Sequence, residues 1–226
     1  MEMESEASSY RVGLAFNLKK GIQSGVEDME AEYDSIDTVM AIKNALESIG
    51  CQVELLEAAH SFLDKLREAH VDIVFNIAEG LSGRGREAHI PAILNFLGIP
   101  FTGSDETTLC IALDKALTKR LLTSFRILTP KHQLMSHEGE RIRHDLKFPL
   151  IVKPNAEGSS KGISNMAVVD DMEQLKHLLE RNFQMYGQPM LIEEFIPGRE
   201  FTVGVIGNGS EARVFTPMEI VYKEDQ

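Results

Sequence analysis

The sequence predicts an α/β fold in two domains, because strand-like and helix-like patterns alternate in the first half of the chain and short strand patterns recur in the second. The chain has 226 residues, which is too long for one minimal domain and suits two modest ones. Hydrophobic residues make up 43% and charged residues 26%, near the average for globular proteins. This composition argues against a fully disordered chain.

Three segments of the first domain have the apolar pattern of strands, at residues 11–17, 52–56 and 71–77. Between the first two, apolar residues recur at helical spacing. Ser35 or Asp34 can cap the start of this helix, and Gly50 suits its end. The segment therefore predicts a βαβ unit.

Two further helices complete the first domain, at residues 61–69 and 87–97. Gly98 suits the end of the second helix, and residues 99–103 are predicted to be extended. Strands that alternate with helices favour a parallel sheet with covering helices, as in Rossmann-like domains. We assign this domain to residues 10–103, after a short acidic tail at residues 1–9 that is expected to be disordered.

The second half of the chain favours a central subdomain at residues 104–196 that mixes helices and strands. Ser104 or Asp105 can cap a helix that runs to about residue 122. The segments after it predict strands at residues 149–153, 163–168 and 190–194, a polar loop at 155–162 and a helix at 171–185.

From residue 197 onward only strand patterns remain. The segments EFTVGVIG and ARVFTPMEIVY flank Asn208 and Gly209, a dipeptide that favours a hairpin turn. Residues 197–226 are therefore predicted to begin a further sheet subdomain, which is incomplete within this sequence.

The charge and the cysteine content argue against several classes of protein. The formal net charge is −12, so no nucleic acid partner is expected, since such partners are met by clustered Lys and Arg. The sequence has no signal peptide pattern and no run approaching the roughly 18 apolar residues of a membrane helix, so we expect a cytoplasmic protein without a membrane partner. Cys51 and Cys110 form no CxxC pair, and the seven histidines lack paired spacing, so zinc is not expected.

The segment PLIVKPNAEGSSKGI combines a buried strand, a lysine at its end and a loop of small residues. Such a loop can lie over a polyphosphate. Gly158 and Gly162 allow the backbone to approach closely, while N–H groups and the hydroxyls of Ser159 and Ser160 can donate hydrogen bonds to phosphate oxygens. Lys153 supplies positive charge. The alternative is an ordinary solvated end of a strand.

Two other segments carry candidate binding residues. In LIEEFIPGREF an apolar strand turns into exposed acids, so backbone groups at Glu194 and Ile196 could read adenine and Glu200 could accept hydrogen bonds from ribose. The alternative is a solvated sheet edge. LDKALTKRLL places Lys115 and Lys119 on one helical face, for which a surface stripe of ion pairs is the default interpretation.

The order of the motifs carries a resemblance. TGSD with LDKALTKRLL, then FPLIVKPNAEGSSKGI, then MLIEEFIPGREFTV resemble the ATP-grasp superfamily, and within it the D-alanine:D-alanine ligases. The resemblance covers about residues 11–222. It implies a pre-ATP-grasp N-terminal domain followed by an ATP-grasp domain, with ATP and Mg²⁺ as cofactors. It also implies small amino-acid or peptide substrates, a place in peptidoglycan biosynthesis and a homodimer as the usual assembly.

By position, the resemblance implies roles for individual residues. The candidates for contacts to the ATP phosphates and the loop over them are Lys115, Lys153, Glu157, Gly158, Ser159, Ser160 and Gly162. The candidates for adenine are Glu193, Glu194, Phe195 and Ile196, and the candidate for ribose is Glu200. The candidate catalytic residues are Lys153, Ser159 and Glu32, of which Glu32, in the segment AEYD, would bind the ammonium group of the first amino acid. A surface acid before a helix is the alternative for Glu32.

The chain departs from the family pattern in two places. The segment FNIAEGLSGRGREAHIPAIL stands where these ligases usually read HG...GEDG, so the substrate can be a different amino acid or a peptide. Residues 76–89 are predicted to form a substrate loop, with candidates Glu79, Arg84, Arg86 and Glu87. The family's oxyanion arginine and magnesium ligands correspond to positions beyond Gln226, so no metal ligand is predicted within these residues.

The implied reaction activates a carboxylate with ATP to an acyl phosphate, which an amine attacks with loss of phosphate. Positioning and charge neutralisation dominate such phosphoryl transfer. Two alternatives stay open. One is a nucleotide-binding module without ligase activity. The other is a serine hydrolase, because residues 158–162 fit GxSxG, although residues 154–157 separate the strand from Ser160 and a nucleophile elbow needs the strand directly before the serine.

Overall fold

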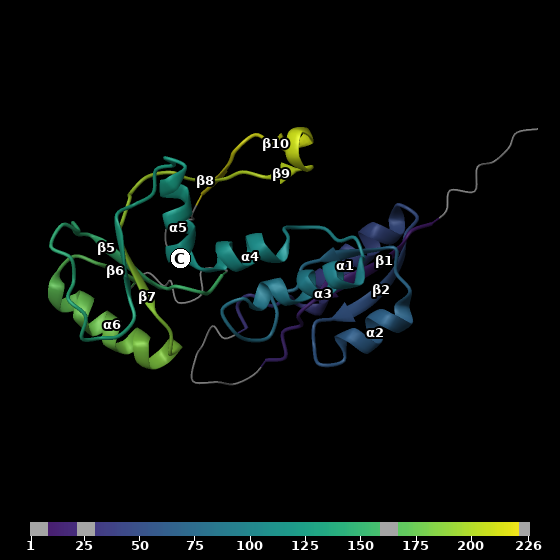
Figure 1. Ribbon diagram of the computed structural model, residues 1–226, viewed down its shortest axis with the longest axis horizontal. Coiled ribbons are helices and arrows are strands. Elements are labelled where there is room, and N and C mark those ends of the chain that lie inside the picture. Colours follow the sequence, from purple (N-terminus) through teal and green to yellow (C-terminus); the bar gives the residue numbers. More distant parts are fainter. Residues whose placement is uncertain (1–8, 22–29, 159–166, 222–226) are drawn as a thin grey trace, which may run out of the picture. The chain divides into compact units, whose positions relative to one another are not determined.

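The computed structural model describes residues 9–21, 30–158 and 167–221, and the chain divides into two compact units, Met1–Glu194 and Phe195–Gln226. Helices and sheets are mixed, so the predicted α/β class is confirmed (Figure 1). The first unit contains two sheets of different kinds. The second unit contains short strands.

The first sheet is parallel, with β1 (Arg11–Phe16) between β2 (Gln52–Glu57) and β3 (Ile73–Asn76). Successive residues of β1 point to opposite faces. Leu14 packs with Val39 of α1 (Ile36–Ser48) on one face. On the other face, Ala15 belongs to a core with residues of α2 (Phe62–Ala69) and α3 (His89–Leu97). The predicted parallel sheet with covering helices is therefore confirmed, and the helices cover both of its faces.

The caps explain where these helices begin and end. Of the two candidate caps of α1, the side chain of Ser35 accepts a hydrogen bond from the Thr38 amide at 3.2 Å. The helix predicted at residues 87–97 begins with a 3-10 turn, Arg86–Ala88, that leads into α3. It ends at Gly98, whose φ of 70° is left-handed. Residues beyond it extend alongside β3, with a bridge between Val74 and Phe101.

The single helix predicted to run from Ser104 or Asp105 to about residue 122 is wrong. The structure has two helices, α4 (Glu106–Leu113) and α5 (Lys115–Ser124), separated by Asp114. The Asp114 side chain accepts a hydrogen bond from the Leu117 amide at 3.0 Å, and its backbone is extended. An aspartate that caps in this way competes with the helical backbone, so the chain restarts a helix there. Asp105 caps α4.

The second sheet is antiparallel, in the order β4-β7-β5-β6. Its strands are β4 (His132–Met135), β5 (Leu150–Pro154), β6 (Val168–Val169) and β7 (Met190–Glu194). The helix α6 (Met172–Tyr186) packs on this sheet and is capped by Asp171 (Figure 1). Val152 and Ile192 pair in the middle of the sheet, in the same core as Leu175 of α6. The sequence did not predict β4, and most of the strand predicted at residues 163–168 lies outside the described residues.

The second unit has two antiparallel pairs. The first joins β8 (Glu200–Thr202) to β11 (Met218–Ile220), and the other joins β9 (Val205–Ile206) to β10 (Arg213–Val214). The predicted hairpin is therefore confirmed, with a 3-10 turn, Gly209–Glu211, after Asn208. All described residues of this unit are exposed, and every buried core residue of the described chain lies before it.

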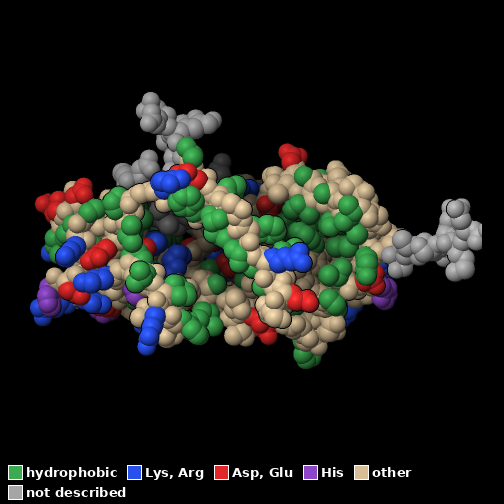
Figure 2. All heavy atoms as spheres, turned by 90° about the horizontal axis from the view of Figure 1, so that it is seen from above, with side chains coloured by type: hydrophobic (Ala, Val, Ile, Leu, Met, Phe, Trp, Pro, Cys, Tyr) green, Lys and Arg blue, Asp and Glu red, His purple; other side chains and the backbone are tan. Residues whose placement is uncertain are grey.

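The surface of the described chain is mixed in character. On the face shown in Figure 2, acidic, basic and hydrophobic side chains are interspersed. Within the described residues, no helix is long and apolar enough to cross a membrane. Cys51 and Cys110 are both free, Cys51 is partly exposed and Cys110 is exposed.

Candidate functional site

Asn155 ties the start of α5 to the end of β5. Its backbone oxygen accepts a hydrogen bond from the Lys115 amide at 3.0 Å, and its side-chain oxygen accepts one from the Ala116 amide at 2.9 Å. Its side-chain nitrogen donates to Asp114 Oδ1 at 2.8 Å. Asn155 is buried and lies two residues after Lys153, so these bonds bring the two helices' junction and the end of β5 together.

The side chains of Lys115 and Lys153 therefore lie close enough for their charges to interact. Burial lowers the pKa of Lys115, and the positive charge of Lys153 lowers it further. The Lys115 ammonium group donates a hydrogen bond to the backbone oxygen of Glu157, where the small-residue loop begins. Two cations from separate elements thus lie close enough to interact, and Lys115 reaches the start of this loop, an arrangement that suits a polyanionic ligand.

Glu193 binds two lysines. On β7 its carboxylate forms ion pairs with Lys153 through Oε1 and with Lys119 through Oε2, the latter at 2.6 Å. Burial would raise the pKa of Glu193, but hydrogen bonds from Lys119 and Lys153 outweigh this effect and leave the pKa below its ordinary value. Only 8% of Lys119 and 5% of Glu193 is exposed. The prediction of a surface stripe for Lys119 and of an exposed Glu193 side chain is therefore wrong.

The remaining nucleotide candidates are distributed over the chain. Glu194 is half-buried, and its Oε1 accepts a hydrogen bond from the Lys147 amide at 3.0 Å. Phe195, Ile196 and Glu200 belong to the second unit, where Glu200 begins β8. Three further candidates, Ser159, Ser160 and Gly162, lie outside the described residues.

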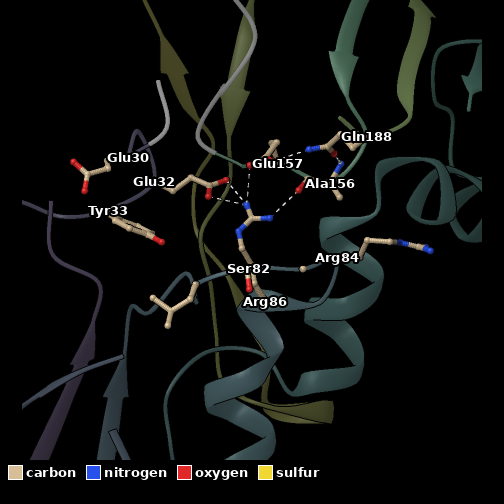
Figure 3. A pocket seen from close by; sticks show the side chains of 11 residues that line it. Glu30, Glu32, Tyr33, Ser82, Arg84, Arg86, Ala156, Glu157 and Gln188 are labelled. Carbon is tan, nitrogen blue, oxygen red and sulfur yellow. Dashed lines mark hydrogen bonds and ion pairs between the residues drawn. The ribbon is translucent and has the colours of Figure 1, made fainter. Parts of the chain in front are cut away.

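Arg86 occupies the centre of a buried cluster of charges (Figure 3). Its Nη2 lies 2.6 and 2.7 Å from the two carboxylate oxygens of Glu32 and 3.2 Å from Glu157 Oε2. Its Nη1 donates a hydrogen bond to the backbone oxygen of Ala156 at 2.8 Å. Burial would lower the pKa of Arg86, but the hydrogen bonds to Glu32 outweigh it and raise the pKa. The guanidinium therefore stays charged.

Glu32 is thus a buried residue and not a surface acid. Only 7% of it is exposed, and the Gly158 amide also donates a hydrogen bond to its Oε1. The carboxylate that the resemblance assigns to a substrate ammonium group is already bound by a protein cation. Arg86 is one of four candidates in the predicted substrate loop, but no pattern in the sequence indicates that its partner is Glu32.

A cavity of about 480 Å³ lies beside this cluster. It is lined by Glu30, Glu32, Tyr33, Leu81, Ser82, Gly83, Arg84, Arg86, Ala156, Glu157 and Gln188. In Figure 3 Arg84 points away from Arg86, and its guanidinium lies 2.8 Å from Asp114 Oδ2. Gln188 donates to Glu157 Oε1 at 2.7 Å, so the carboxylates at the edge of the cavity are held in place.

A second cavity, of about 550 Å³, contains the other two loop candidates, Glu79 and Glu87. Burial raises the pKa of Glu79 to about 7, and the nearby charges of Glu87 and Glu32 contribute to this shift. Burial also raises the pKa of Glu87. The Glu79 backbone is fixed because its amide donates to Asn17 Oδ1 at 2.9 Å. All four loop candidates therefore line cavities, either this one or the cavity beside Arg86.

The described residues also bear on two other chemistries, serine hydrolysis and metal binding. Residues 155–158 follow β5 without regular structure, so β5 does not lead directly into Ser159 and Ser160, which lie outside the described residues. That spacing does not fit a nucleophile elbow. Among the side chains that the structure describes, no group of three or more His, Cys, Asp or Glu could hold a metal ion.

Comparison with known proteins identifies several ligases as relatives of this chain. A family model described as the C-terminus of D-ala D-ala ligase matches residues 122–226. A D-alanine–D-alanine ligase of Bordetella avium is 35% identical over 206 residues, which cover 90% of this chain and 62% of that protein. The Aquifex aeolicus ligase is 36% identical over 178 residues, covering 76% of this chain and 57% of its own length. The chain thus spans less than two thirds of these curated relatives.

Solved structures agree at the level of the fold. The D-alanine–D-alanine ligase of Bacillus anthracis, in a complex with ATP, matches with a TM-score of 0.68 and 22% identity over 96% of this chain and 72% of that one. The ligase of Helicobacter pylori matches with a TM-score of 0.66 and 19% identity, over 93% of this chain and 75% of its own.

Proposed function

Because the chain resembles D-alanine–D-alanine ligases along most of its length, we propose that it is an ATP-grasp protein and forms the nucleotide-binding part of an ATP-dependent carboxylate–amine ligase. The observation that supports this most is the pair of lysines, Lys115 and Lys153, whose charges interact and of which Lys115 bonds the backbone of Glu157. ATP is the proposed cofactor. The proposed sites remain those assigned from the resemblance, including the residues outside the described chain.

The proposed reaction joins a carboxylate to an amine. Bound Mg-ATP would supply the phosphoryl group that activates the carboxylate. The chain's own contribution is electrostatic: Lys115 and Lys153 would neutralise phosphate charge, and the backbone at Glu157 and Gly158 would lie against the same phosphates. Lys115 and Lys153 are therefore the side chains that we assign to the phosphates of the nucleotide.

The domain organisation is part of the proposal. Residues 10–103, with the parallel sheet and the cavity residues Glu32, Glu79 and Glu87, would bind the amino-acid or peptide substrate. Residues 104–196 would form the central ATP-grasp subdomain, and residues 197–226 would begin the next one. A cytoplasmic location and a homodimer, both expected from the sequence and its resemblance, are proposed with it.

A ligase that acts on a substrate other than D-alanine is the second candidate function. It is favoured by Arg86, whose guanidinium binds both carboxylate oxygens of Glu32 at 2.6 and 2.7 Å. A carboxylate that is paired in this way is less available to a substrate ammonium group. Release of ADP or phosphate in the presence of different amino acids and dipeptides distinguishes the two candidates. If nucleotide binds but no ADP or phosphate is released with any of these substrates, the result would support a nucleotide-binding module without ligase activity.

Thermal denaturation with and without Mg-ATP tests nucleotide binding. At a ligand concentration of about 100 times Kd we expect a rise in Tm of about 5–10 °C. Lys153→Ala should remove most of this rise. Lys65→Ala, on the exposed face of α2, is the matched control and should keep it. The proposal is wrong if the unmodified chain shows no rise in Tm with Mg-ATP.

A further inference from the structure

Lys119 is a buried cation for which the proposed function has no role. It lies one turn after Lys115 on α5, and 8% of it is exposed. Its ammonium group lies 2.6 Å from Glu193 Oε2 and donates a hydrogen bond to Thr129 Oγ1, also at 2.6 Å. Burying an ammonium group costs free energy unless the group is paired with an opposite charge. A buried lysine at this position therefore needs an explanation other than the preference of lysine for helices.

The partner of Lys119 supplies that reason. Glu193 uses its other oxygen to bind Lys153, so one buried carboxylate joins two ammonium groups. With both lysines present, the three groups carry a net charge of about +1. Without Lys119, the pair of Glu193 and Lys153 would be neutral. In a partly buried environment such a difference of one charge acts strongly on a nearby anion.

We propose that Lys119 is a positioning residue for the nucleotide. This inference rests on the proposed function, in which Lys153 contacts the ATP phosphates. Lys119 binds the far oxygen of Glu193 and shares its negative charge, so that Lys153 keeps a net positive field toward the phosphates. It also fixes the Glu193 carboxylate, and through it the Lys153 ammonium group, without touching the ligand.

The dependence on ligand charge separates this role from a purely structural one. A lysine that acts on the field of Lys153 affects ATP more than ADP and does not affect adenosine, which has no phosphate. A lysine that only satisfies a buried carboxylate affects folding stability and changes the three affinities equally. The ratio of the adenosine Kd to the ATP Kd is therefore the decisive quantity.

The experiment measures binding of ATP, ADP and adenosine by isothermal titration calorimetry, in magnesium-containing buffer, for the unmodified chain and for Lys119→Met. We expect the ATP affinity to fall about tenfold or more, the ADP affinity to fall less and the adenosine affinity to stay unchanged. Lys119→Arg keeps the charge and should restore most of the ratio. Lys176→Met removes a surface lysine from α6 and should leave all three affinities unchanged.

Lys119→Met leaves the buried Glu193 carboxylate with one cationic partner in place of two, and this can unfold the chain. A second variant keeps the test decisive in that case. Lys119→Gln removes the positive charge but keeps a side-chain amide that can donate a hydrogen bond to Glu193, so it should fold and its ratio of adenosine Kd to ATP Kd should fall as that of Lys119→Met does. The inference is overturned if either folded variant loses affinity for all three ligands equally, or if Lys119→Met binds ATP as the unmodified chain does. Failure of the unmodified chain to bind any of the ligands would instead overturn the proposed function, and this inference with it.

Discussion

Glu79 is a carboxyl group that the fold holds among other carboxylates. Burial and the charges of Glu87 and Glu32 raise its pKa from the ordinary value of 4.5 to about 7. In the unfolded chain these influences are absent. Between pH 4.5 and about 7 the folded chain therefore binds more protons than the unfolded chain, and the free energy of unfolding falls as the pH rises through this range.

Replacing Glu79 by Gln should remove this pH dependence. At pH 8 we expect Glu79→Gln to raise the free energy of unfolding by about 1–2 kcal/mol, a value reduced for solvent screening because the side chain is only half-buried. Below pH 4.5 the variant and the unmodified chain should have equal stability. Urea denaturation at the two pH values measures both. The raised pKa of Glu79 would be contradicted if Glu79→Gln changed the free energy of unfolding equally at both pH values. It would also be contradicted if the exposed Glu68→Gln had the same effect as Glu79→Gln.

Single residues show how far a sequence can predict a site. Lys153 and Gly158 could be singled out because a strand, a lysine and small residues follow one another directly in the chain. Arg86 and Glu32 are 54 residues apart, and only the fold brings them together. Lys119 has the spacing of a surface lysine on a helix, so its burial could not be inferred from its neighbours in the sequence.

At the scale of elements, the junction between α4 and α5 determines where Lys115 lies. Asp114 caps α5, accepts a hydrogen bond from Asn155 at 2.8 Å and pairs with Arg84. The carboxylate thus joins the start of one helix to the loop after β5. The exposed Arg84 adds little to this, since surface ion pairs contribute little to stability.

Asp114→Ala tests the junction, with Asp105→Ala as the matched control at the start of α4. We expect Asp114→Ala to lower the free energy of unfolding by about 1–2 kcal/mol, because it removes an N-cap, and also to reduce the rise in Tm caused by Mg-ATP. Asp105→Ala removes the cap of a helix that does not carry Lys115, so it should lower stability and leave that rise intact. Equal loss of the rise in both variants would count against a link between the cap and the nucleotide.

Elements also show which parts of the fold local patterns can predict. The helices and strands of the first sheet have clear apolar spacing and caps, and they lie within a few residues of their predicted bounds. The break at Asp114 was missed because the apolar pattern continues across it and only a hydrogen bond to the Leu117 amide interrupts the helix. β4 was missed because its residues HQLM are too short and too polar to have strand periodicity, and pairing with β7 decides its conformation.

For the whole molecule, the buried apolar residues are concentrated before residue 195. Among the residues that the structure describes, all three cores lie in the first unit, and the last buried apolar residue is Ile192 of β7. The apolar side chains of the second unit, such as Phe201 and Phe215, are exposed. Hydrophobic stabilisation of the described chain therefore comes from the first unit.

A chain ending at Glu194 should consequently keep its stability. We expect its Tm to lie within about 2 °C of that of the full chain, with a single cooperative transition. A chain ending at residue 189 loses β7 and the buried Met190, Leu191 and Ile192, each of which contributes about 2 kcal/mol or more, and should not fold. Differential scanning calorimetry measures both. A Tm lower by about 10 °C for the longer of the two would show that the second unit contributes to the packing of the first.

The three hydrogen bonds that join Asn155 to residues 114–116 have a thermodynamic consequence. They hold Lys115 near Lys153 in the free protein, so the repulsion between two cations is already present in the native state. The native state is locally frustrated: the interactions that favour folding oppose the electrostatics at this place. An anion that binds there relieves the frustration and meets a preorganised site, so little conformational entropy is lost on binding. A nucleotide bound as proposed would therefore remove part of this repulsion and would meet side chains that are already held in place.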